Sequence, residues 1–231
     1  MKRFYRGATV VAAEGGFAIA LDGKPVLTPA KAKLVVSSRV MAEAVAAEWL
    51  TQGDDMQIAA LPLTRLASAA IDMIAPRRDA VIAETAKYAG TDLVCYRVAT
   101  PRDLAERQEL LWQPLIDWAR QRFDAPLLTT TGIAPIAQPT ASLAALAAAV
   151  AIRHPMELTA LRLATATAGS LIIALALMER RLDSDAAFAA AELDESYQIA
   201  NWGEDAEQTR RRAGLRDDIM LADRFVTLHR G

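Results

Sequence analysis

The hydrophobic pattern of this sequence changes near residue 63, from short strand-like runs to the period of α-helices. Before that point, apolar runs alternate with turns that contain glycine. From Leu63 to Ile74, apolar side chains recur at the three- and four-residue steps that place them on one face of a helix. The change predicts a chain in two parts, a small β-rich part followed by a larger helical part.

The first part carries the marks of β-hairpins. Residues 8–13 and 17–21 are β-prone runs separated by Glu14-Gly15-Gly16, and Asp22-Gly23 precedes a third short run. An Asp-Gly pair favours a type I′ turn, because that turn needs positive φ at both central positions. We therefore expect a meander of antiparallel strands.

A helix is expected directly after these strands. Ser37 or Ser38 can cap its start, and Met41, Val45 and Trp49 form its inward stripe before the chain reaches Gly53. Hairpins followed by a packed helix make an α+β unit, which we place at residues 1–70.

Residues 71–231 are expected to form an all-α bundle. Helix faces in this part are dominated by alanine, and small side chains let helices approach closely. Pro76 is expected to stop one helix and open the next. Cap-like residues precede another helix at Thr100, and Trp112 and Trp118 are expected to lie in its core and at its rim. The last helices are expected at residues 140–152, 155–182 with a bend at Gly169-Ser170, 184–202 closed by Gly203, and 215–228.

The overall composition excludes several classes of partner. The chain has 231 residues and a formal net charge of −2, so nothing favours binding to nucleic acid. A single cysteine excludes an internal disulfide and fits a reducing compartment. The most apolar stretch, residues 158–178, contains Arg162 and reads as a buried helix, so we expect no membrane span.

Residues for covalent or metal-assisted catalysis are also missing. The spacing from Gly16 to Gly23 does not fit a phosphate-binding loop, and there is no dinucleotide fingerprint. Two histidines leave little material for a metal site or for a base beside Cys95, which we expect in the interior. Ser170 lacks the glycine two residues later that a nucleophile elbow needs, and its core-like neighbours predict a packing role instead. We expect no catalytic residue, no metal and no cofactor.

Acidic side chains share a helix face with apolar ones near the C-terminus. On a helix over residues 184–202, steps of 100° align Phe188, Glu192, Glu195, Ile199 and Trp202. Two interpretations remain open. The acids either meet solvent or an arginine such as Arg180 at a helix rim, or they form a recognition surface for a basic partner. Trp202 is expected to anchor the core as well.

The segment after that helix continues the acidic character. Glu204, Asp205 and Glu207 follow Trp202 closely, and Arg210, Arg211 and Arg212 then reverse the sign. Acids at the start of a helix also complement its dipole, so both interpretations apply here too.

Five stretches together resemble one family, the F1-ATPase assembly chaperones that attend the α subunit in mitochondria and alpha-proteobacteria. They are DGKPVLTP at 22–29, LPLTRLA at 61–67 with AID at 70–72, YAGTDLVCYR at 88–97, QPLIDW at 113–118, and LDESYQ at 193–198 with NWGE at 201–204.

The resemblance implies a β-containing N-terminal domain, a helical C-terminal domain and a non-enzymatic function. That function is binding of the unassembled F1 α subunit, so that its subunit interface does not aggregate. The family's dependence on a C-terminal acidic residue points to Glu204 first, then Glu195 and Glu207, with Glu192 and Trp202 beside them. The missing presequence before Phe4 predicts a member of the family in the bacterial cytoplasm rather than in the mitochondrial matrix, the family's eukaryotic location. We also expect the protein to be a monomer.

Two alternatives remain at this point. The chain could be an enzyme that uses an acid–base pair, such as Asp92 with Asp72 or with Glu195. It could also be a permanent structural subunit of a complex.

Overall fold

The computed structural model describes residues 2–132 and 134–231, and the fold divides into two compact units. The first unit comprises Met1–Arg78, His154–Ala160 and Arg224–Gly231; the second comprises Asp79–Arg153 and Leu161–Asp223. A four-stranded sheet lies near the N-terminus, and most of the described chain beyond it is helical. The α+β class is confirmed, whereas the division into domains 1–70 and 71–231 stays a prediction.

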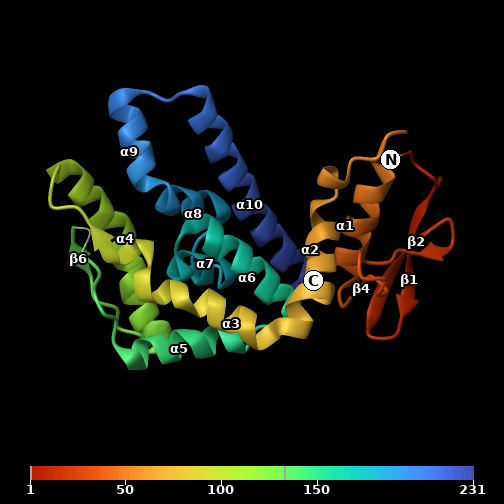
Figure 1. Ribbon diagram of the computed structural model, residues 1–231, viewed down its shortest axis with the longest axis horizontal. Coiled ribbons are helices and arrows are strands. Elements are labelled where there is room, and N and C mark those ends of the chain that lie inside the picture. The colour runs from red at the N-terminus through yellow and green to blue at the C-terminus, as the bar shows by residue number, and fades with distance from the viewer. Residues whose placement is uncertain (1, 133) are drawn as a thin grey trace. The chain divides into compact units, whose positions relative to one another are not determined.

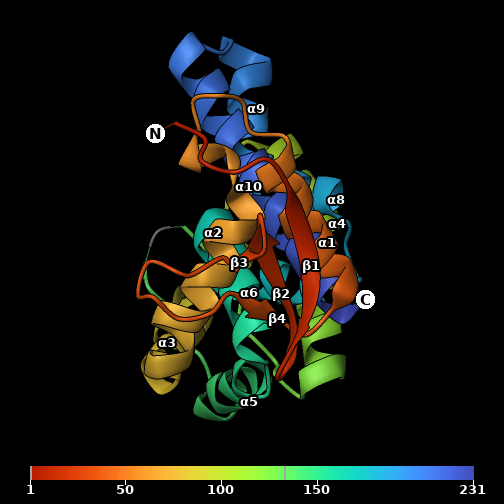
Figure 2. The same ribbon diagram turned by 90° about the vertical axis from the view of Figure 1, so that its right-hand side faces the viewer.

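The sheet of the first unit is centred on its second strand. Its strands are β1 (Ala8–Ala13), β2 (Gly16–Leu21), β3 (Lys24–Pro25) and β4 (Val35–Val36). β1, β2 and β3 form the expected meander, and β4 returns to pair with β2. β2 pairs antiparallel with each of the other three, and Figure 2 shows them side by side. Asp22 and Gly23, with φ of 48° and 82°, form the turn before β3. The predicted hairpin turn is confirmed.

Gly16 is required where β2 meets β4. Its φ is 147°, and a Cβ atom at this position would lie 2.2 Å from the carbonyl oxygen of Val36. Any larger residue would push the two strands apart, because that oxygen belongs to the backbone.

Helix α1 (Arg39–Leu50) packs against this sheet. The Ser38 side chain accepts a hydrogen bond from the backbone N–H of Met41, which is the predicted cap. Met41 is fully buried. The predicted end at Gly53 is wrong, because Thr51 already closes the last turn on the carbonyls of Ala47 and Glu48.

Helix α2 (Pro62–Ala69) begins on a carboxylate from α1. Glu48 accepts hydrogen bonds from the N–H groups of Leu63 and Thr64, at 2.6 and 2.9 Å. The predicted stop at Pro76 is wrong. A π-helical segment (Ala70–Ile74) and a 3-10 turn (Ala75–Arg77) lead directly into α3 (Arg78–Ala86), and a proline in the first positions of such a turn needs no N–H partner.

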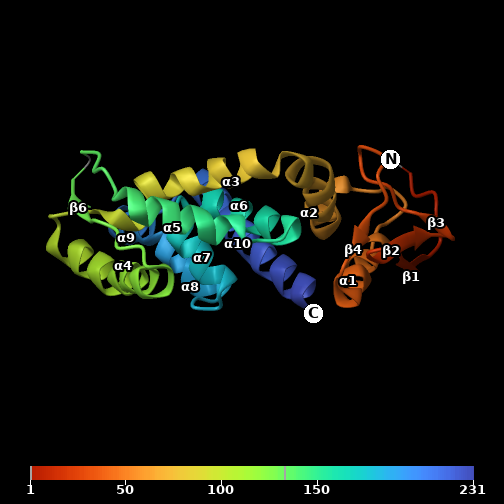
Figure 3. The ribbon, with the colours of Figure 1, turned by 90° about the horizontal axis from the view of Figure 1, so that it is seen from below.

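The second unit is built around a short apolar helix, α7. It contains β5 (Tyr96–Arg97), α4 (Arg102–Phe123), β6 (Thr130–Thr131), α5 (Thr140–Ala151), α7 (Leu171–Met178), α8 (Ser184–Ala191) and α9 (Leu193–Trp202). Helices α6 (Pro155–Ala168) and α10 (Ala206–Arg230) belong to both units, because residues 154–160 and 224–231 are part of the first unit. Every residue of α7 is buried, and Figures 1 and 3 show it among the surrounding helices of this unit. The expected helical character of this part is confirmed, but the part is not all-α, because β5 and β6 pair as a short parallel sheet. Helix α10 begins at Ala206 rather than near Leu215.

The start of α7 is fixed by a buried aspartate. Gly169, with φ of 62°, interrupts the helical run, and the Ser170 side chain caps α7 by accepting from the N–H of Ile173. The Ser170 hydroxyl donates to Asp92 at 2.5 Å, and Asp92 also accepts from the N–H of Ile172 at 3.0 Å. The predicted bend and the packing role of Ser170 are confirmed.

Helix α4 has a different start from the expected one. Its N-cap is Pro101, without a side-chain hydrogen bond, so the predicted cap at Thr100 is wrong. Trp112 is fully buried and donates from Nε1 to the carbonyl of Ala190 at 2.9 Å, whereas Trp118 is half-buried. The assignment of these two residues to core and rim is confirmed.

Candidate recognition site

The acidic segment lies where the chain turns from α9 into α10. Residues 201–207, which we call the tip, contain the end of α9, the connection at Gly203 and the start of α10. Figure 1 shows this turn with the two helices descending from it. Gly203 has a φ of 88°, a conformation that glycine adopts without strain.

A capping box fixes the start of α10. Asp205 Oδ1 accepts from the N–H groups of Glu207 and Gln208, both at 2.8 Å. The Gln208 side chain returns the interaction by accepting from the Asp205 N–H at 3.0 Å. Reciprocal bonds of this kind satisfy the free donors of a first helical turn, so Asp205 has a structural role.

The predicted single helix over residues 184–202 is wrong, because it is broken at Glu192. This residue has φ of −107° and ψ of 24°, outside the helical range, and it separates α8 from α9. Its backbone closes both helices, since its N–H donates to the carbonyl of Phe188 and its carbonyl accepts from Ser196. The break turns the Glu192 side chain inward, so the five-residue stripe expected from 100° steps does not form.

Two arginines of α10 hold an acid within α9 and one on each side of that helix. Glu192 Oε2 lies 3.3 Å from Arg211 and 3.3 Å from Arg212 Nε. Arg211 also lies 3.6 Å from Glu195, and Arg212 reaches Glu204 at 3.7 Å. This ion-pair network fastens the two helices to each other below the tip.

Burial makes Glu192 the most perturbed acid of the network. Its loss of contact with water raises its pKa, and the positive charges of Arg211 and Arg212 offset only part of that effect. Glu195 adds a repulsive charge that raises the pKa further. Glu192 is therefore a structural acid whose charge depends on its two arginine partners.

The tip itself presents an unusual exposed side chain. Trp202 is 77% exposed, so the expectation that it anchors the core is wrong. Because α9 ends at this residue, its ring lies beyond the packed part of the helix. Glu207 is also exposed, and the Glu204 side chain retains 28% of its accessible surface beside Arg212. An apolar ring with carboxylates around it is therefore what the tip offers to a partner.

The structure thus divides the five residues proposed from sequence into two groups. Glu192 and Glu195 are tied into the network, while Trp202 and Glu207 lie at the tip. Glu204 belongs to both groups, because it lies at the tip and pairs with Arg212. Arg180 is not the counter-ion, because it pairs with Asp223. The run of arginines at 210–212 is visible in the sequence, but its pairing with α9 depends on the antiparallel return of α10.

The carboxylates considered for acid–base catalysis are occupied by structural hydrogen bonds. Asp72 belongs to the first unit and accepts from the Thr28 hydroxyl at 2.7 Å and from the Ala30 N–H at 2.9 Å. Asp92 belongs to the second unit, where burial raises its pKa to about 6 despite its hydrogen bonds. Each carboxylate holds a loop or helix start in place.

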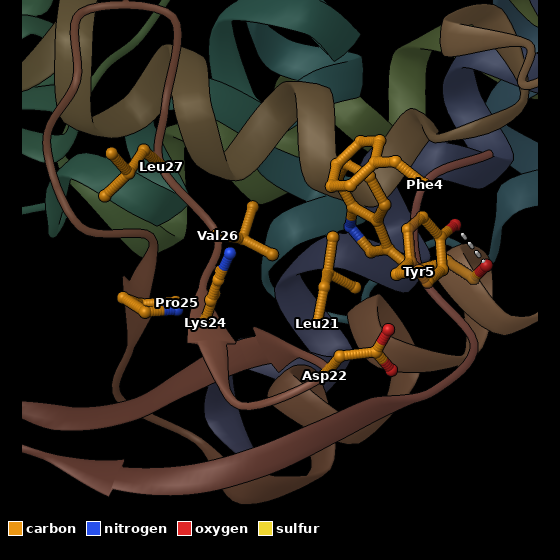
Figure 4. A pocket seen from close by; sticks show the side chains of 9 residues that line it. Phe4, Tyr5, Leu21, Asp22, Lys24, Pro25, Val26 and Leu27 are labelled. Carbon is orange, nitrogen blue, oxygen red and sulfur yellow. Dashed lines mark hydrogen bonds between the residues drawn. The ribbon is translucent and has the colours of Figure 1, made fainter. Parts of the chain in front are cut away.

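A hollow of about 260 Å³ in the first unit contains little chemistry. Figure 4 shows its lining, in which Tyr5 donates to the carbonyl of Trp49 at 2.6 Å. Both oxygens of Asp22 accept backbone hydrogen bonds, from Arg6 and Gly7. These bonds lower the pKa of Asp22, that from Arg6 most strongly. The carboxylate supports a turn.

Three further features of the described chain are the state of its cysteine, the placement of its metal-ligating side chains and the apolar length of its helices. Cys95 is buried, which raises its pKa to about 12, so its nucleophilic thiolate is scarcely formed at neutral pH. Among residues 2–132 and 134–231, no three metal-ligating side chains come together. In the same ranges, no helix combines the length and apolar character that crossing a bilayer requires.

Known proteins resemble this chain along its whole length. A family model described as ATP12 chaperone protein matches residues 2–120. The crystal structure of Atp12 from Paracoccus denitrificans is 38% identical with a TM-score of 0.95, over 99% of this chain and 98% of that one. A variant of the Paracoccus protein with an aspartate replaced by lysine matches at 38% identity and a TM-score of 0.95, over 99% of this chain and 97% of that one. The Agrobacterium tumefaciens protein Atu1473 is 40% identical with a TM-score of 0.91, over 97% of this chain and 84% of that one.

Proposed function

This chain belongs to the ATP12 chaperone family, the non-enzymatic assembly chaperones of F1-ATPase, and from that premise we propose that it binds the unassembled F1 α subunit through the tip. The observation that carries the proposal is Trp202, which is 77% exposed at the end of α9. Family membership also sets aside the acid–base enzyme considered from the sequence.

An exposed tryptophan suits a client that has not yet met its own partner. Permanent subunit interfaces are large and apolar, so a subunit that awaits assembly exposes apolar surface that promotes aggregation. Tryptophan is among the residues that contribute most binding energy when an interface covers them. Trp202 can therefore dock on an apolar part of the α-subunit interface.

The carboxylates of the tip restrict which apolar surface is accepted. Glu207 and the exposed part of Glu204 favour a surface that carries lysine or arginine near its apolar centre. The capping box at Asp205 and the pairing of Glu204 with Arg212 hold these groups in place before binding. A preorganised surface loses little conformational entropy when the partner arrives.

Two further features belong to the proposal. The chain acts as a monomer, since one tip supplies the complete set of contacts described above. It works in a bacterial cytoplasm, which the similarity to proteins from Paracoccus and Agrobacterium supports.

The proposal is tested by titrating the purified protein into isolated F1 α subunit while light scattering records aggregation. We expect scattering to fall with increasing protein and to level off once the complex has formed, without nucleotide hydrolysis. Scattering that stays unchanged across the titration would contradict the proposal. Permanent co-purification with finished F1 would instead support the alternative of a structural subunit.

The role of the tip is tested by charge reversal in Glu207→Lys. Glu207 is exposed and no ion pair links its side chain to another described residue, so the variant should keep the melting temperature of the wild type. Its affinity for the α subunit should fall, and the salt dependence of binding should decrease. Asp54→Lys, an exposed charge reversal in the first unit, is the matched control and should bind as the wild type does.

A further inference from the structure

The outer edge of β1 carries a row of backbone groups without partners. β1 pairs with β2 along one side, from Ala8 opposite Leu21 to Ala13 opposite Gly16. In the described part of the chain, no strand pairs with its other side. An antiparallel strand directs the N–H and C=O of alternate residues to opposite sides, so half of the β1 groups face outward.

Two hydrogen bonds identify which residues these are. The N–H of Asp22 donates to the carbonyl of Gly7 at 3.1 Å, so Gly7 and Asp22, which stand opposite each other just beyond the pair of Ala8 and Leu21, are a hydrogen-bonded pair. By alternation, Thr9, Val11 and Ala13 bond to β2, and Ala8, Val10 and Ala12 do not.

The far side of β2 gives the same assignment independently. Ile19, which stands opposite Val10, accepts at its carbonyl from the N–H of Val26 at 2.8 Å. The groups of Ile19 therefore face away from β1, and those of Val10 face away from β2. On the outer side of β1, Ala8, Val10 and Ala12 form no backbone hydrogen bond to another described residue.

This edge lacks the features that normally keep other strands away. Natural edge strands carry charged side chains or proline, or they are very short or covered. β1 has six residues, Ala-Thr-Val-Val-Ala-Ala, and none of them is charged or a proline. Ala8 is buried and Val10 half-buried, whereas Thr9, Val11 and Ala12 are exposed, with Val11 at 42%, so the accessible part of the edge runs from Thr9 to Ala12. A neutral, β-branched and accessible edge is a template for pairing with another strand.

We propose that the outer edge of β1 binds an extended, uncharged segment of the client by strand addition. The inference rests on the proposed function, since the client is the unassembled F1 α subunit. The outward N–H and C=O groups of Val10 and Ala12 bond to the backbone of the segment, and Thr9 and Val11 contact alternate side chains on the exposed face. Backbone pairing is tolerant of sequence, so this edge holds the chain while the tip recognises it.

Amide hydrogen exchange, read residue by residue with and without isolated α subunit, tests the edge. In the free protein, the outward amides of Val10 and Ala12 should exchange quickly, while those of Thr9 and Val11 are slow in their bonds to β2. In the complex, the outward amides should slow by at least about tenfold, and the inward amides should hardly change.

A substitution that removes a backbone N–H is the second test of the β1 edge. Val10→Pro removes an outward N–H and leaves the ladder to β2 intact, which is where edge strands accept proline. It should weaken α-subunit binding by at least about tenfold, while Val10→Ala, which keeps the N–H, should stay within about twofold. If Val10→Pro lowers the melting temperature, Ala12→Pro replaces it, and the exchange experiment on the wild type still decides.

The outcomes separate this inference from the proposed function. If no complex forms with the wild type, the proposed function fails. If a complex forms and the amides of Val10 and Ala12 remain fast, strand addition is overturned while the proposed function stands. Protection that appears in the chain alone as its concentration rises would show a second copy on the edge, and it would also overturn the inference.

Discussion

Replacement of Trp202 by alanine separates a binding role from a folding role. The side chain is 77% exposed, so only about a quarter of its surface, about 60 Å², is covered in the fold. At about 25 cal/mol per Å², this area contributes at most about 1.5 kcal/mol to the free energy of unfolding. For a chain of this length, the melting temperature should fall by no more than about 3–6 °C.

The same substitution should affect binding far more strongly. A tryptophan at the centre of an interface typically contributes at least about 2 kcal/mol, which is about a 30-fold change in Kd. Isothermal titration of isolated α subunit into wild type and Trp202→Ala measures this change. Ile152→Ala is the matched control, since Ile152 is 75% exposed in the second unit but lies after α5, and it should bind normally.

Two results would refute the reasoning on Trp202. Binding within about twofold of the wild type would show that the tip is not the contact surface. A drop in melting temperature beyond about 10 °C would show that Trp202 supports the fold after all.

Three further predictions concern the polar groups that hold the second unit together. The pKa of Asp92 in the folded protein is raised from 3.8 to about 6, so the stability that protonated Asp92 gives the fold is fully present below about pH 4 and is lost as the pH rises towards 6. Urea unfolding should show the wild type losing about 3 kcal/mol of unfolding free energy relative to Asp92→Asn over this range. Parallel pH curves for the two proteins would contradict the assignment. Ser170→Ala removes both the cap of α7 and the hydroxyl bonded to Asp92, so the free energy of unfolding should fall by about 2–4 kcal/mol in the same assay. A loss below about 0.5 kcal/mol would refute the role of the cap. Arg212→Ala leaves buried Glu192 with one arginine fewer, so the free energy of unfolding should fall by about 1–3 kcal/mol and proteolysis between α9 and α10 should become faster. The control Arg210→Ala removes an exposed arginine and should change the free energy of unfolding by less than about 0.5 kcal/mol. Equal effects of the two variants would argue against the network.

Local sequence signals predicted much of the fold. The Asp22-Gly23 turn, the Ser38 cap and the bend at Gly169 depend on residues that are neighbours in sequence, and each was correctly expected. The helix ends expected at Gly53 and Pro76 were wrong. At the first, the Thr51 hydroxyl donates to the carbonyl of Glu48, and at the second, π and 3-10 segments continue the helical path. Neither arrangement can be read from the residue types alone.

The candidate site depended more on tertiary pairing. An ideal 100° step assumes an unbroken helix, and the break at Glu192 removed this residue from the expected face. Its partners, Arg211 and Arg212, are distant in sequence and reach it only because α10 runs back along α9. Exposure of Trp202 likewise follows from where α9 ends rather than from the apolar character of the residue.

The central claim is that this chaperone recognises the F1 α subunit only before assembly. Size-exclusion chromatography with light scattering can compare mixtures of the protein with isolated α subunit and with assembled F1. We expect a complex with isolated α subunit and none with assembled F1, whose subunit contacts already cover the surface that the tip binds. Equal binding to both, or binding to neither, would contradict it.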